Sequence, residues 1–533
     1  MALTSPQDAE GHVASRPSLR QNRVMRVVRS LLVGVTALAT LTAVVPAVVP
    51  VVAHAKPSDG ISMPGLCKGP YNAAAQRGFD VSRVSADRVV TFDRKRVKLD
   101  RKGWASFNPR DPSWTLWFHS LAWLVPLALD EPRTAVDVFV ERDKALPDPG
   151  ASVGNRVRRP IGWTQGQFRT RLDVANCLYN LTDDPRLVPI AKRLAAANMD
   201  PLRYPGPPNF AVHNHGTMGN ITLMQAGKTF GQQAWIDFAL KRFKRDLPYV
   251  FESCGMMREQ SSTYQLHNLK LWSKTAAQLG TSLEAERRAL GALVRPDGVL
   301  EAIGDGQPDS GLEPNGESLW CRETGWAAGT LPGGATSDDT AGDAHFTLRF
   351  GPRMRFHGHL DHGSLTWFAL GAPVLSDRGL FSKDRGPRFD YAHTMAAHSV
   401  FEPVGSPKYD PATSATRISP TEYSLRDAVD GIERLRDVRI GPDRLVVRDR
   451  GRGAKEWIQH WQLAPGWEPT ATGAVNEAAG LTLTIDCPKL KPVRVEAFTA
   501  WRTAVDAWDI QCRVSGDRTG ARLTTTLTVM PTS

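Results

Sequence analysis

Cysteine is scarce in this chain. Six cysteines occur in 533 residues, and they stand far apart in the sequence. Zinc sites built on cysteine use closely spaced pairs, so this spacing excludes that kind of site. Disulfides are compatible with an exported protein, although a fold of this size does not need them. Cys487 and Cys512 lie in neighbouring strand-like segments and are the pair that we expect to be bonded.

Long apolar runs are also scarce. The run from Leu31 to Val52 is the one stretch long enough to cross a membrane. It follows a basic patch and ends at Ala53-His54-Ala55, which is typical of a secretory signal with a small-x-small cleavage site. Two prolines near its end favour cleavage over a retained anchor. We therefore predict a signal peptide over residues 1–55 and a secreted or cell-envelope protein with no stable membrane span after cleavage.

The sequence contains no recognisable nucleic-acid-binding motif, and basic residues outnumber acidic ones. The 66 lysines and arginines exceed the 55 aspartates and glutamates, so the net charge is +11. A basic exported protein favours acidic partners such as an anionic polysaccharide. Because the basic residues are scattered, a soluble surface with a basic bias explains the composition as well.

The periodicity of apolar residues changes along the chain. From Ser113 they recur at intervals of three and four, as in Leu187, Ile190, Ala191 and Leu194. Further helices are expected at about 262–279 and 283–294. Residues 329–342 resemble a linker, and beyond them the period becomes two, as in Leu481, Leu483 and Ile485. The pattern predicts a helical domain followed by an antiparallel β domain.

Side chains suited to proton transfer and metal binding gather in a few short segments. The densest is 357–364, where His357, His359 and Asp361 occupy alternate positions. If residues 355–361 are extended, these three side chains share one face of a strand. The other segments are His213-Asn214-His215-Gly216-Thr217, Glu259-Gln260-Ser261-Ser262-Thr263-Tyr264, Gly304-Asp305-Gly306 and Ser376-Asp377-Arg378-Gly379.

In their order and spacing, these segments resemble the heparinase II/III-like polysaccharide lyases, a family that includes heparin lyases and some alginate lyases. The resemblance covers about residues 200–400. It implies an α+β multidomain protein with an incomplete (α/α) toroid over residues 56–332 and an antiparallel β-sandwich domain over 333–533. It also implies a lyase that acts on an anionic polysaccharide containing uronic acid.

Such a lyase cleaves by β-elimination, in which a base removes the C5 proton and the C4 oxygen leaves. The enzyme must neutralise the uronate carboxylate and supply a base and an acid. The resemblance implies catalytic roles for four residues: Asn214 as the neutraliser, His215 as a base or carboxylate contact, Tyr264 as base and then acid, and His357 as the histidine contributed by the β domain. Without the resemblance, an ordinary structural role is the simpler interpretation for Asn214 and for Tyr264.

Other residues are expected to contact substrate or a metal. Glu259 is expected to orient a neighbour or contact sugar, and Arg388 could meet a uronate. Gln265 stands where the family often has a histidine. By the same resemblance, His359, Asp377 and His398 hold a structural divalent metal, and two imidazoles with a carboxylate suit zinc. A hydrogen-bonded polar cluster without metal is the alternative. No organic cofactor is expected.

Two other functions remain open at this stage. A glycoside hydrolase on the same scaffold would need two facing carboxylates, and no convincing pair stands out in the sequence. A non-catalytic protein that binds glycan or assists polymer assembly would not need Asn214, His215, Tyr264 and His357 together.

Overall fold

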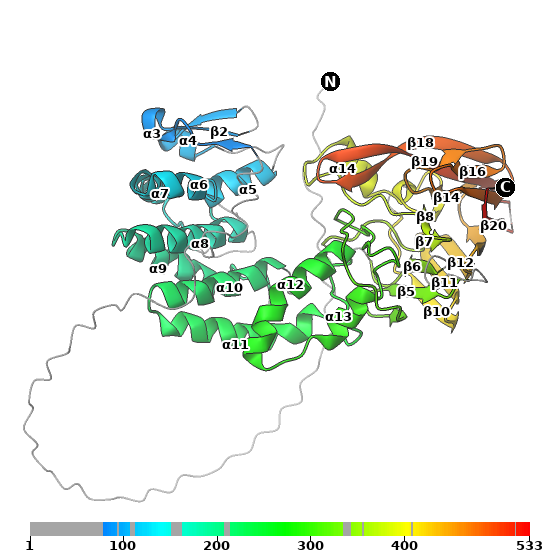
Figure 1. The fold of residues 1–533 in the computed structure, drawn as a ribbon, viewed down its shortest axis with the longest axis horizontal. Helices are drawn as coiled ribbons and strands as arrows, with labels where there is room; N and C mark the ends of the chain where they lie inside the picture. The colour runs from blue at the N-terminus through cyan, green and yellow to red at the C-terminus, as the bar shows by residue number, and fades with distance from the viewer. Residues whose placement is uncertain are drawn as a thin grey trace, which may run out of the picture. The chain divides into compact units, whose positions relative to one another are not determined.

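The structure is a computed structural model that describes residues 78–92, 95–106, 112–150, 162–206, 214–333, 343–353, 356–406, 409–517 and 519–532. The predicted signal peptide lies outside the described residues. The described residues all belong to one compact unit, residues 61–533, in which a small sheet and a series of helices are followed by the larger sheets (Figure 1). Within the described ranges, no helix is both long and apolar enough to cross a membrane.

A small antiparallel sheet precedes the long helices. Its strands pair in the order β1 (Phe79–Asp80), β2 (Val89–Phe92) and β3 (Lys95–Lys98), with the short helices α3 (Val84–Asp87) and α4 (Arg101–Trp104) beside them. The ring of Phe79 stacks on Phe92 at 4.1 Å and on Trp123 at 6.2 Å, between ring centroids. Aromatic stacking therefore fixes this sheet to the helices that follow.

The helical part confirms the predicted periodicity. The predicted face of α9, which includes Leu187 and Leu194, is buried. The helices expected at 262–279 and 283–294 are present, although the second ends at Gly291. The helices are α5 (Pro112–Ser120), α6 (Leu124–Asp130), α7 (Pro132–Ala145), α8 (Gln165–Thr182), α9 (Leu187–Met199), α10 (Asn214–Thr229), α11 (Gln233–Val250), α12 (Ser262–Leu279) and α13 (Glu284–Gly291).

Local sequence sets where these helices begin and end. Thr164 and Gln167 form a capping box at the start of α8. The Ser261 hydroxyl accepts the backbone N–H of Tyr264 at 3.3 Å, which caps α12 and places Tyr264 in its first turn. Gly280, with φ of 66°, ends the same helix. Leu121 adopts φ of 59° and separates α5 from α6.

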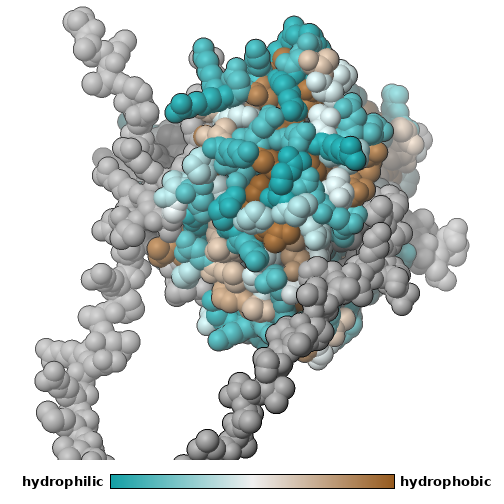
Figure 2. All heavy atoms as spheres, turned by 90° about the vertical axis from the view of Figure 1, so that its left-hand side faces the viewer, coloured by the Kyte–Doolittle hydropathy of each residue, from teal (hydrophilic) through white to brown (hydrophobic). Residues whose placement is uncertain are grey.

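Successive helices pack against one another: α8 contacts α9 and α10, and α10 contacts α11 and α12 (Figure 1). Figure 2 shows one face of the molecule, on which hydrophilic side chains predominate and apolar residues form small patches. The helical part is thus confirmed, while its closure into an incomplete toroid remains a prediction.

The C-terminal part contains three antiparallel sheets. The first pairs β4 (Leu319–Cys321), β5 (Trp326–Leu331), β6 (Ala344–Arg349), β7 (Leu365–Ala369) and β8 (Ala372–Leu375) in that order. Strand β5 pairs with β6 across the predicted domain boundary at residues 332 and 333. The change from helix to strand therefore falls earlier, between Gly291 and Leu319.

The two other sheets share one hydrophobic core with the first. Leu481, Leu483 and Ile485 point into this core as the alternation predicted. The eight-stranded sheet has the order β10 (Ser414–Ser419), β11 (Glu422–Val429), β12 (Ile432–Ile440), β13 (Arg444–Arg452), β20 (Ala521–Pro531), β17 (Leu481–Asp486), β16 (Gly473–Asn476) and β15 (Glu468–Pro469). The four-stranded sheet has the order β18 (Leu490–Ala500), β19 (Thr503–Ser515), β14 (Glu456–Gln462) and β9 (Phe401–Pro403), and α14 (Pro387–Ala392) and a 3-10 turn (Met395–Ala397) lie between β8 and β9.

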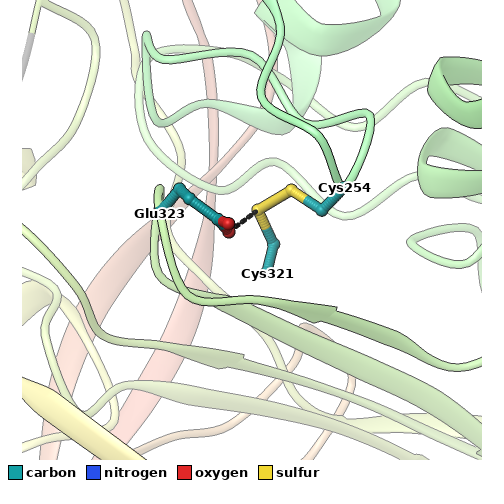
Figure 3. A group of neighbouring side chains, drawn as sticks. All are labelled: Cys254, Cys321 and Glu323. Carbon is teal, nitrogen blue, oxygen red and sulfur yellow. Dashed lines mark hydrogen bonds between the residues drawn. A yellow bond between two sulfur atoms is a disulfide. The ribbon is translucent and has the colours of Figure 1, made fainter.

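Disulfides reinforce both parts. The predicted bond between Cys487 and Cys512 is present. A second bond joins Cys254, which follows α11, to Cys321 on β4, so it ties the helical part to the first sheet. The Glu323 carboxylate lies beside this bond, with Oε2 3.6 Å from the Cys321 sulfur (Figure 3). Because both sulfurs are in the disulfide, this group is structural and does not offer thiolates to a metal. Cys177 is also disulfide-bonded.

Candidate active site

The segment 356–364 is a loop between β6 and β7, so our prediction of a strand over 355–361 was wrong. Around His357 its backbone is bonded to other loops, and only Gly363 and Ser364 bond a strand, at Arg349 where β6 ends. The His357 N–H donates to the Glu259 carbonyl at 3.3 Å, and the His357 carbonyl accepts the Asp305 N–H at 2.8 Å. Gly363 has φ of +87°, a conformation that extended strands do not contain. Backbone hydrogen bonds to two segments of the helical part, at Glu259 and at Asp305, thus fix the position of the loop.

Asp361 does not share a face with the histidines as the strand pattern predicted. Its carboxylate accepts the Arg349 Nε at 3.2 Å, and both side chains are buried. His357 and His359, by contrast, both reach the carboxylate of Asp305. The extended chain would have aligned all three side chains, whereas the loop separates Asp361 from them.

The start of α10 brings the Asn-His-Gly segment to this loop. Asn214 is the first residue of the helix and is buried, and its N–H donates to Glu259 Oε1 at 3.0 Å. Gly216 allows close packing here, because an added Cβ would lie 2.7 Å from the Pro205 carbonyl oxygen. His215 is half-buried, and its carbonyl accepts Gln165 Nε2 at 2.9 Å.

Tyr264 and His357 form the centre of the cluster. Their rings are stacked, with centroids 3.5 Å apart and planes inclined by 10°. The His357 imidazole lies between two carboxylates: Nδ1 is 2.9 Å from Asp305 Oδ2, and Nε2 is 3.3 Å from Glu259 Oε2. Tyr264 comes from the first turn of α12 and His357 from the loop before β7, so the cluster joins the helical part to the first sheet.

Lys383 adds a positive charge to this cluster. Its ammonium donates to Asp305 Oδ2, lies 3.4 Å from His357 Nδ1, and stands 5.4 Å from the centre of the Tyr264 ring. His267 is also near, with its ring edge-on to Tyr264 at 6.1 Å between centroids. Burial and the charges of His357, Lys270 and Arg169 lower the pKa of His267 to about 4, so this imidazole is neutral at pH 7.

The two carboxylates beside His357 have opposite proton affinities. Burial raises the pKa of Glu259 to about 8, against the opposing effects of the Asn214 N–H and the charge of Lys383. Burial would also raise the pKa of Asp305, but hydrogen bonds from His357, His359 and His393 and the charge of Lys383 hold it far below its ordinary value. Asp305 is therefore ionised at neutral pH, while Glu259 carries a proton in much of the population.

The three predicted metal ligands lie together behind this cluster. One ligand atom from each of His359, Asp377 and His398 falls within 4.8 Å of the others, and all three side chains are buried. His398 Nδ1 is 2.8 Å from Asp377 Oδ2. Among the described residues, His359 Nδ1 and His398 Nε2 are buried without a hydrogen-bond partner. Unpaired buried imidazole nitrogens are costly unless something binds them, so the residues present fit a divalent metal.

A second group of possible ligands shares His359 with the first. It consists of Asp305, His359 and His393, and His393 Nε2 lies 3.4 Å from Asp305 Oδ1. In this second group the Asp305 carboxylate is already occupied by His357 and Lys383. The trio with Asp377 and His398 is the better site, because its free nitrogens have no competing partner within the described part of the chain.

The structure brings most of the predicted site residues together. Asn214, Glu259, Tyr264 and His357 are linked by the contacts above. His215 is adjacent in sequence, and its ring borders α8, because a Cβ added to Gly166 would lie 3.5 Å from His215 Cε1. Arg388 is elsewhere engaged: its guanidinium is exposed on α14 and bonds Glu496 of β18, with Nε 2.7 Å from Oε2.

Sequence reasoning missed several members of the cluster. The turn at Asp305 was noticed, but no role was assigned to its carboxylate, and neither Lys383 nor His267 was considered. His267 carries a signal, since it follows Tyr264 by three positions and therefore shares a face of α12 with it. Lys383 lies in a loop far from the other segments, so no spacing pointed to it. Gln265 is structural: its side-chain oxygen accepts the Met257 N–H at 2.8 Å and its amide donates to the Gly255 carbonyl at 2.8 Å.

Comparison with known proteins finds solved structures that have a similar fold. No family model matches the sequence, and neither does any curated protein. Among solved structures, a heparinase III superposes with a TM-score of 0.64 at 14% identity, over 82% of this chain and 81% of that chain. A heparinase III with methylated lysines gives 0.56 at 12% identity over 81% and 80%. The heparan sulfate lyase HepC from Pedobacter heparinus gives 0.54 at 14% identity over 80% and 78%. The chain thus has the fold of these polysaccharide lyases.

Proposed function

We propose that this protein is an exported polysaccharide lyase that cleaves a uronate-containing anionic polysaccharide by β-elimination. The observation that carries the proposal is the stack of Tyr264 on His357, between Glu259 and Asp305 and beside the start of α10. A phenol, an imidazole and a side-chain amide are the groups that this reaction needs. The likeness in fold to heparinase III supports the same reaction class.

In this proposal, Asn214 and His215 neutralise the uronate carboxylate. The backbone N–H of Asn214 donates to Glu259 Oε1, which holds the residue at the helix N-terminus, and a side-chain amide can donate to a carboxylate. The positive end of the helix dipole also favours an anion there. Neutralising the carboxylate makes the adjacent C5–H more acidic, because the negative charge that develops on proton removal is stabilised.

Tyr264 acts first as base and then as acid. Its phenolate takes the C5 proton, the C–H electron pair forms the C4–C5 double bond through the enolate, and the C4–O bond breaks. The departing oxygen then receives the proton from the Tyr264 phenol. Lys383, 5.4 Å from the ring centre, favours the phenolate by its charge.

His357 is oriented by Asp305 and exchanges a proton through Nε2. Because Asp305 is ionised and bonded to Nδ1, the proton of the neutral imidazole resides on Nδ1. The Glu259 carboxyl faces Nε2 and contributes a proton that His357 can accept or share. Arg388 remains a proposed substrate contact, and it would have to exchange Glu496 for a uronate.

His359, Asp377 and His398 would hold a structural divalent metal, for which zinc suits the two imidazoles and one carboxylate. Such an ion would supply rigidity to the loop that carries His357, since His359 is two residues further on. The residues that move protons in the proposal are Tyr264 and His357.

One observation supports the hydrolase alternative. The pKa of Glu259 is raised and the pKa of the nearby Asp305 is lowered. An acid and a base of this kind serve glycosidases. However, both carboxylates contact the same imidazole, so His357 fills the space that a glycosidic bond would need. This arrangement favours the lyase.

Incubation of the full chain with hyaluronan, heparan sulfate, alginate, glucuronan and pectate tests the proposal. The expected product of one of them absorbs in the ultraviolet, because elimination creates an unsaturated uronate. New reducing ends without that absorbance would establish a hydrolase instead, and binding without either product would establish a glycan-binding protein.

A further inference from the structure

The outer face of the eight-stranded sheet carries two hollows that the proposed reaction does not use. The larger, of about 940 Å³, lies over β11, β12, β13 and β20, and the smaller, of about 200 Å³, lies over the other end of the same strands. Alternate residues of these strands fill the core, so the residues between them face away from it. None of the residues that line either hollow belongs to the Tyr264 cluster.

Arginines dominate the charge of this face. Along β13, Arg444, Arg448, Arg450 and Arg452 are all exposed. The two carboxylates of the larger hollow are already neutralised: Glu422 Oε1 is 3.0 Å from Arg439 Nε, and Asp437 Oδ2 is 2.8 Å from Arg450 Nη2.

Arg444 and Arg448 also line the larger hollow. Neither has an ion-pair partner among the described residues. At about 3.3 Å per residue they stand about 13 Å apart along β13. The register places Thr528 opposite Arg444 and Thr524 opposite Arg448, so each guanidinium has a hydroxyl beside it on β20. On β12, Asp437 stands opposite Arg448, but its carboxylate is bonded to Arg450.

We propose that the larger hollow, whose lining includes Arg444, Arg448, Thr524 and Thr526, is a second binding site for an anionic polysaccharide, separate from the Tyr264 cluster; the choice of polymer rests on the proposed function. Guanidinium groups bond carboxylate or sulfate in a forked geometry, and threonine hydroxyls both donate to and accept from sugar hydroxyls. A polymer with regularly spaced uronate groups could bind both guanidinium groups at once, because they lie on one extended strand.

The lining favours polysaccharide over single-stranded nucleic acid. Binding of unpaired bases relies on aromatic side chains that stack on them. The aromatic residue among the lining of the larger hollow is Tyr423, which is buried and donates its hydroxyl to the Pro420 carbonyl at 2.7 Å. It offers no exposed ring to a base.

The inner face of the sheet gives the site a mechanical connection to the loop 356–364. Arg434 and Arg436, which point inward from β12, donate to the carbonyls of His362 and Gly363 at 2.8 and 2.7 Å. The proposed surface is therefore the opposite face of the sheet that supports the catalytic loop. A chain bound there would keep the polymer near the enzyme between cleavage events and raise its effective concentration.

Binding measured on the full chain in a Tyr264→Phe background tests the site, because the polymer is then not consumed. The probes are fluorescent alginate and fluorescent heparan sulfate, with dextran as the neutral control. Arg444→Gln combined with Arg448→Gln should weaken binding of at least one probe about tenfold at 0.15 M salt and reduce its salt dependence. Thermal unfolding should be unchanged, since both side chains are exposed.

The matched control removes the same charge elsewhere. Arg96 and Arg133 are exposed on β3 and α7 with no ion-pair partner in the described ranges, and Arg96→Gln with Arg133→Gln should leave affinity unchanged. Equal weakening by both double variants would overturn the site in favour of a general charge effect. So would unchanged binding in the Arg444/Arg448 variant, no binding of either probe, or tighter binding of single-stranded DNA that the same variant abolishes. These outcomes concern binding alone, so they are distinct from failure of the lyase assay.

Discussion

Two histidines on one loop, His357 and His359, lie in opposite surroundings. The His357 side chain is 18% exposed and stacks on Tyr264, with Lys383 nearby. The His359 side chain is 0% exposed and faces Asp377 and His398. Asp305 bonds both rings through different oxygens. The contrast teaches that one histidine motif is divided by its access to water. We call His357 and its neighbours, to which we assign proton transfer, the exposed half, and we call His359 with Asp377 and His398, to which we assign a structural role, the dry half.

The largest expected effect is on the exposed half. Tyr264→Phe removes the phenolic oxygen that we assign as base and acid, so turnover should fall by about a thousandfold or more. The ring and its stack on His357 are kept, so the thermal midpoint should stay the same. Ultraviolet detection of the unsaturated product, paired with circular dichroism, measures both. Turnover within tenfold of the parent would refute the assignment.

Alanine at each histidine sharpens the contrast between the two halves. His357→Ala should lower turnover about a hundredfold while changing unfolding little. His359→Ala should lower the free energy of unfolding by about 3 kcal/mol, because it opens a cavity and leaves buried polar atoms unpaired. Denaturant unfolding separates the two outcomes.

We also expect the residues of the dry half to bind the metal. His398→Ala should abolish metal content measured on purified protein, whereas His393→Ala, from the alternative group, should retain it. The opposite pattern would assign the metal site to Asp305, His359 and His393 instead. Absence of metal in the parent protein would leave a hydrogen-bonded cluster in its place.

Lys383 allows a test within the exposed half. Lys383→Met removes the charge beside Tyr264 and Asp305, so turnover should fall roughly tenfold and the rising limb of the pH–rate profile should move to higher pH. Lys383→Arg keeps the charge and should restore most of the rate. A purely structural lysine would change the thermal midpoint and leave the pH profile in place.

The two carboxylates beside His357 predict opposite pH dependence of stability. The pKa of Glu259 rises to about 8 in the folded protein, above its unfolded value, so the fold binds the proton more tightly and loses stability as the pH rises between about 4.5 and 8. Glu259→Gln should therefore be more stable than the parent at pH 8, by about 1 kcal/mol or more.

Asp305 is expected to show the opposite pH dependence of stability. Its folded pKa is depressed, so its contribution is present above the unfolded value near 4 and is lost as the pH falls towards the folded pKa. Asp305→Asn should be destabilised at pH 7. Chemical denaturation at pH 5, 7 and 8 measures both variants, and parallel pH curves for the two would contradict the assignment of their charges.

The smallest effect is expected at Arg388. Its ion pair with Glu496 is exposed, so Arg388→Gln should leave the thermal midpoint unchanged. If Arg388 leaves Glu496 to bind a uronate, the variant should raise KM several-fold with little change in kcat. An unchanged KM would remove Arg388 from the proposed substrate contacts.

Much of the fold followed from local patterns. The buried face of α9, the limits of α12 and the alternation in β17 depend on periodicity and capping, which act over a few residues. The bond between Cys487 and Cys512 could be foreseen because it joins neighbouring strand-like segments. The bond between Cys254 and Cys321 could not, since it depends on how a loop after α11 meets β4.

The sequence by itself determined which chemistry the chain can offer: an Asn-His-Gly helix start, a tyrosine in a first turn, and histidines spaced by two. Only the tertiary structure decided how these groups are used. It replaced the expected strand with a loop, turned Asp361 to Arg349, and brought Asp305 and Lys383 to His357. Burial and charge at one imidazole depend on contacts with residues that lie more than a hundred positions apart in the sequence, such as Glu259 and Lys383. Spacing along the chain carries no record of such contacts, so the division of 357–359 into an exposed and a dry half could be seen only in the folded molecule.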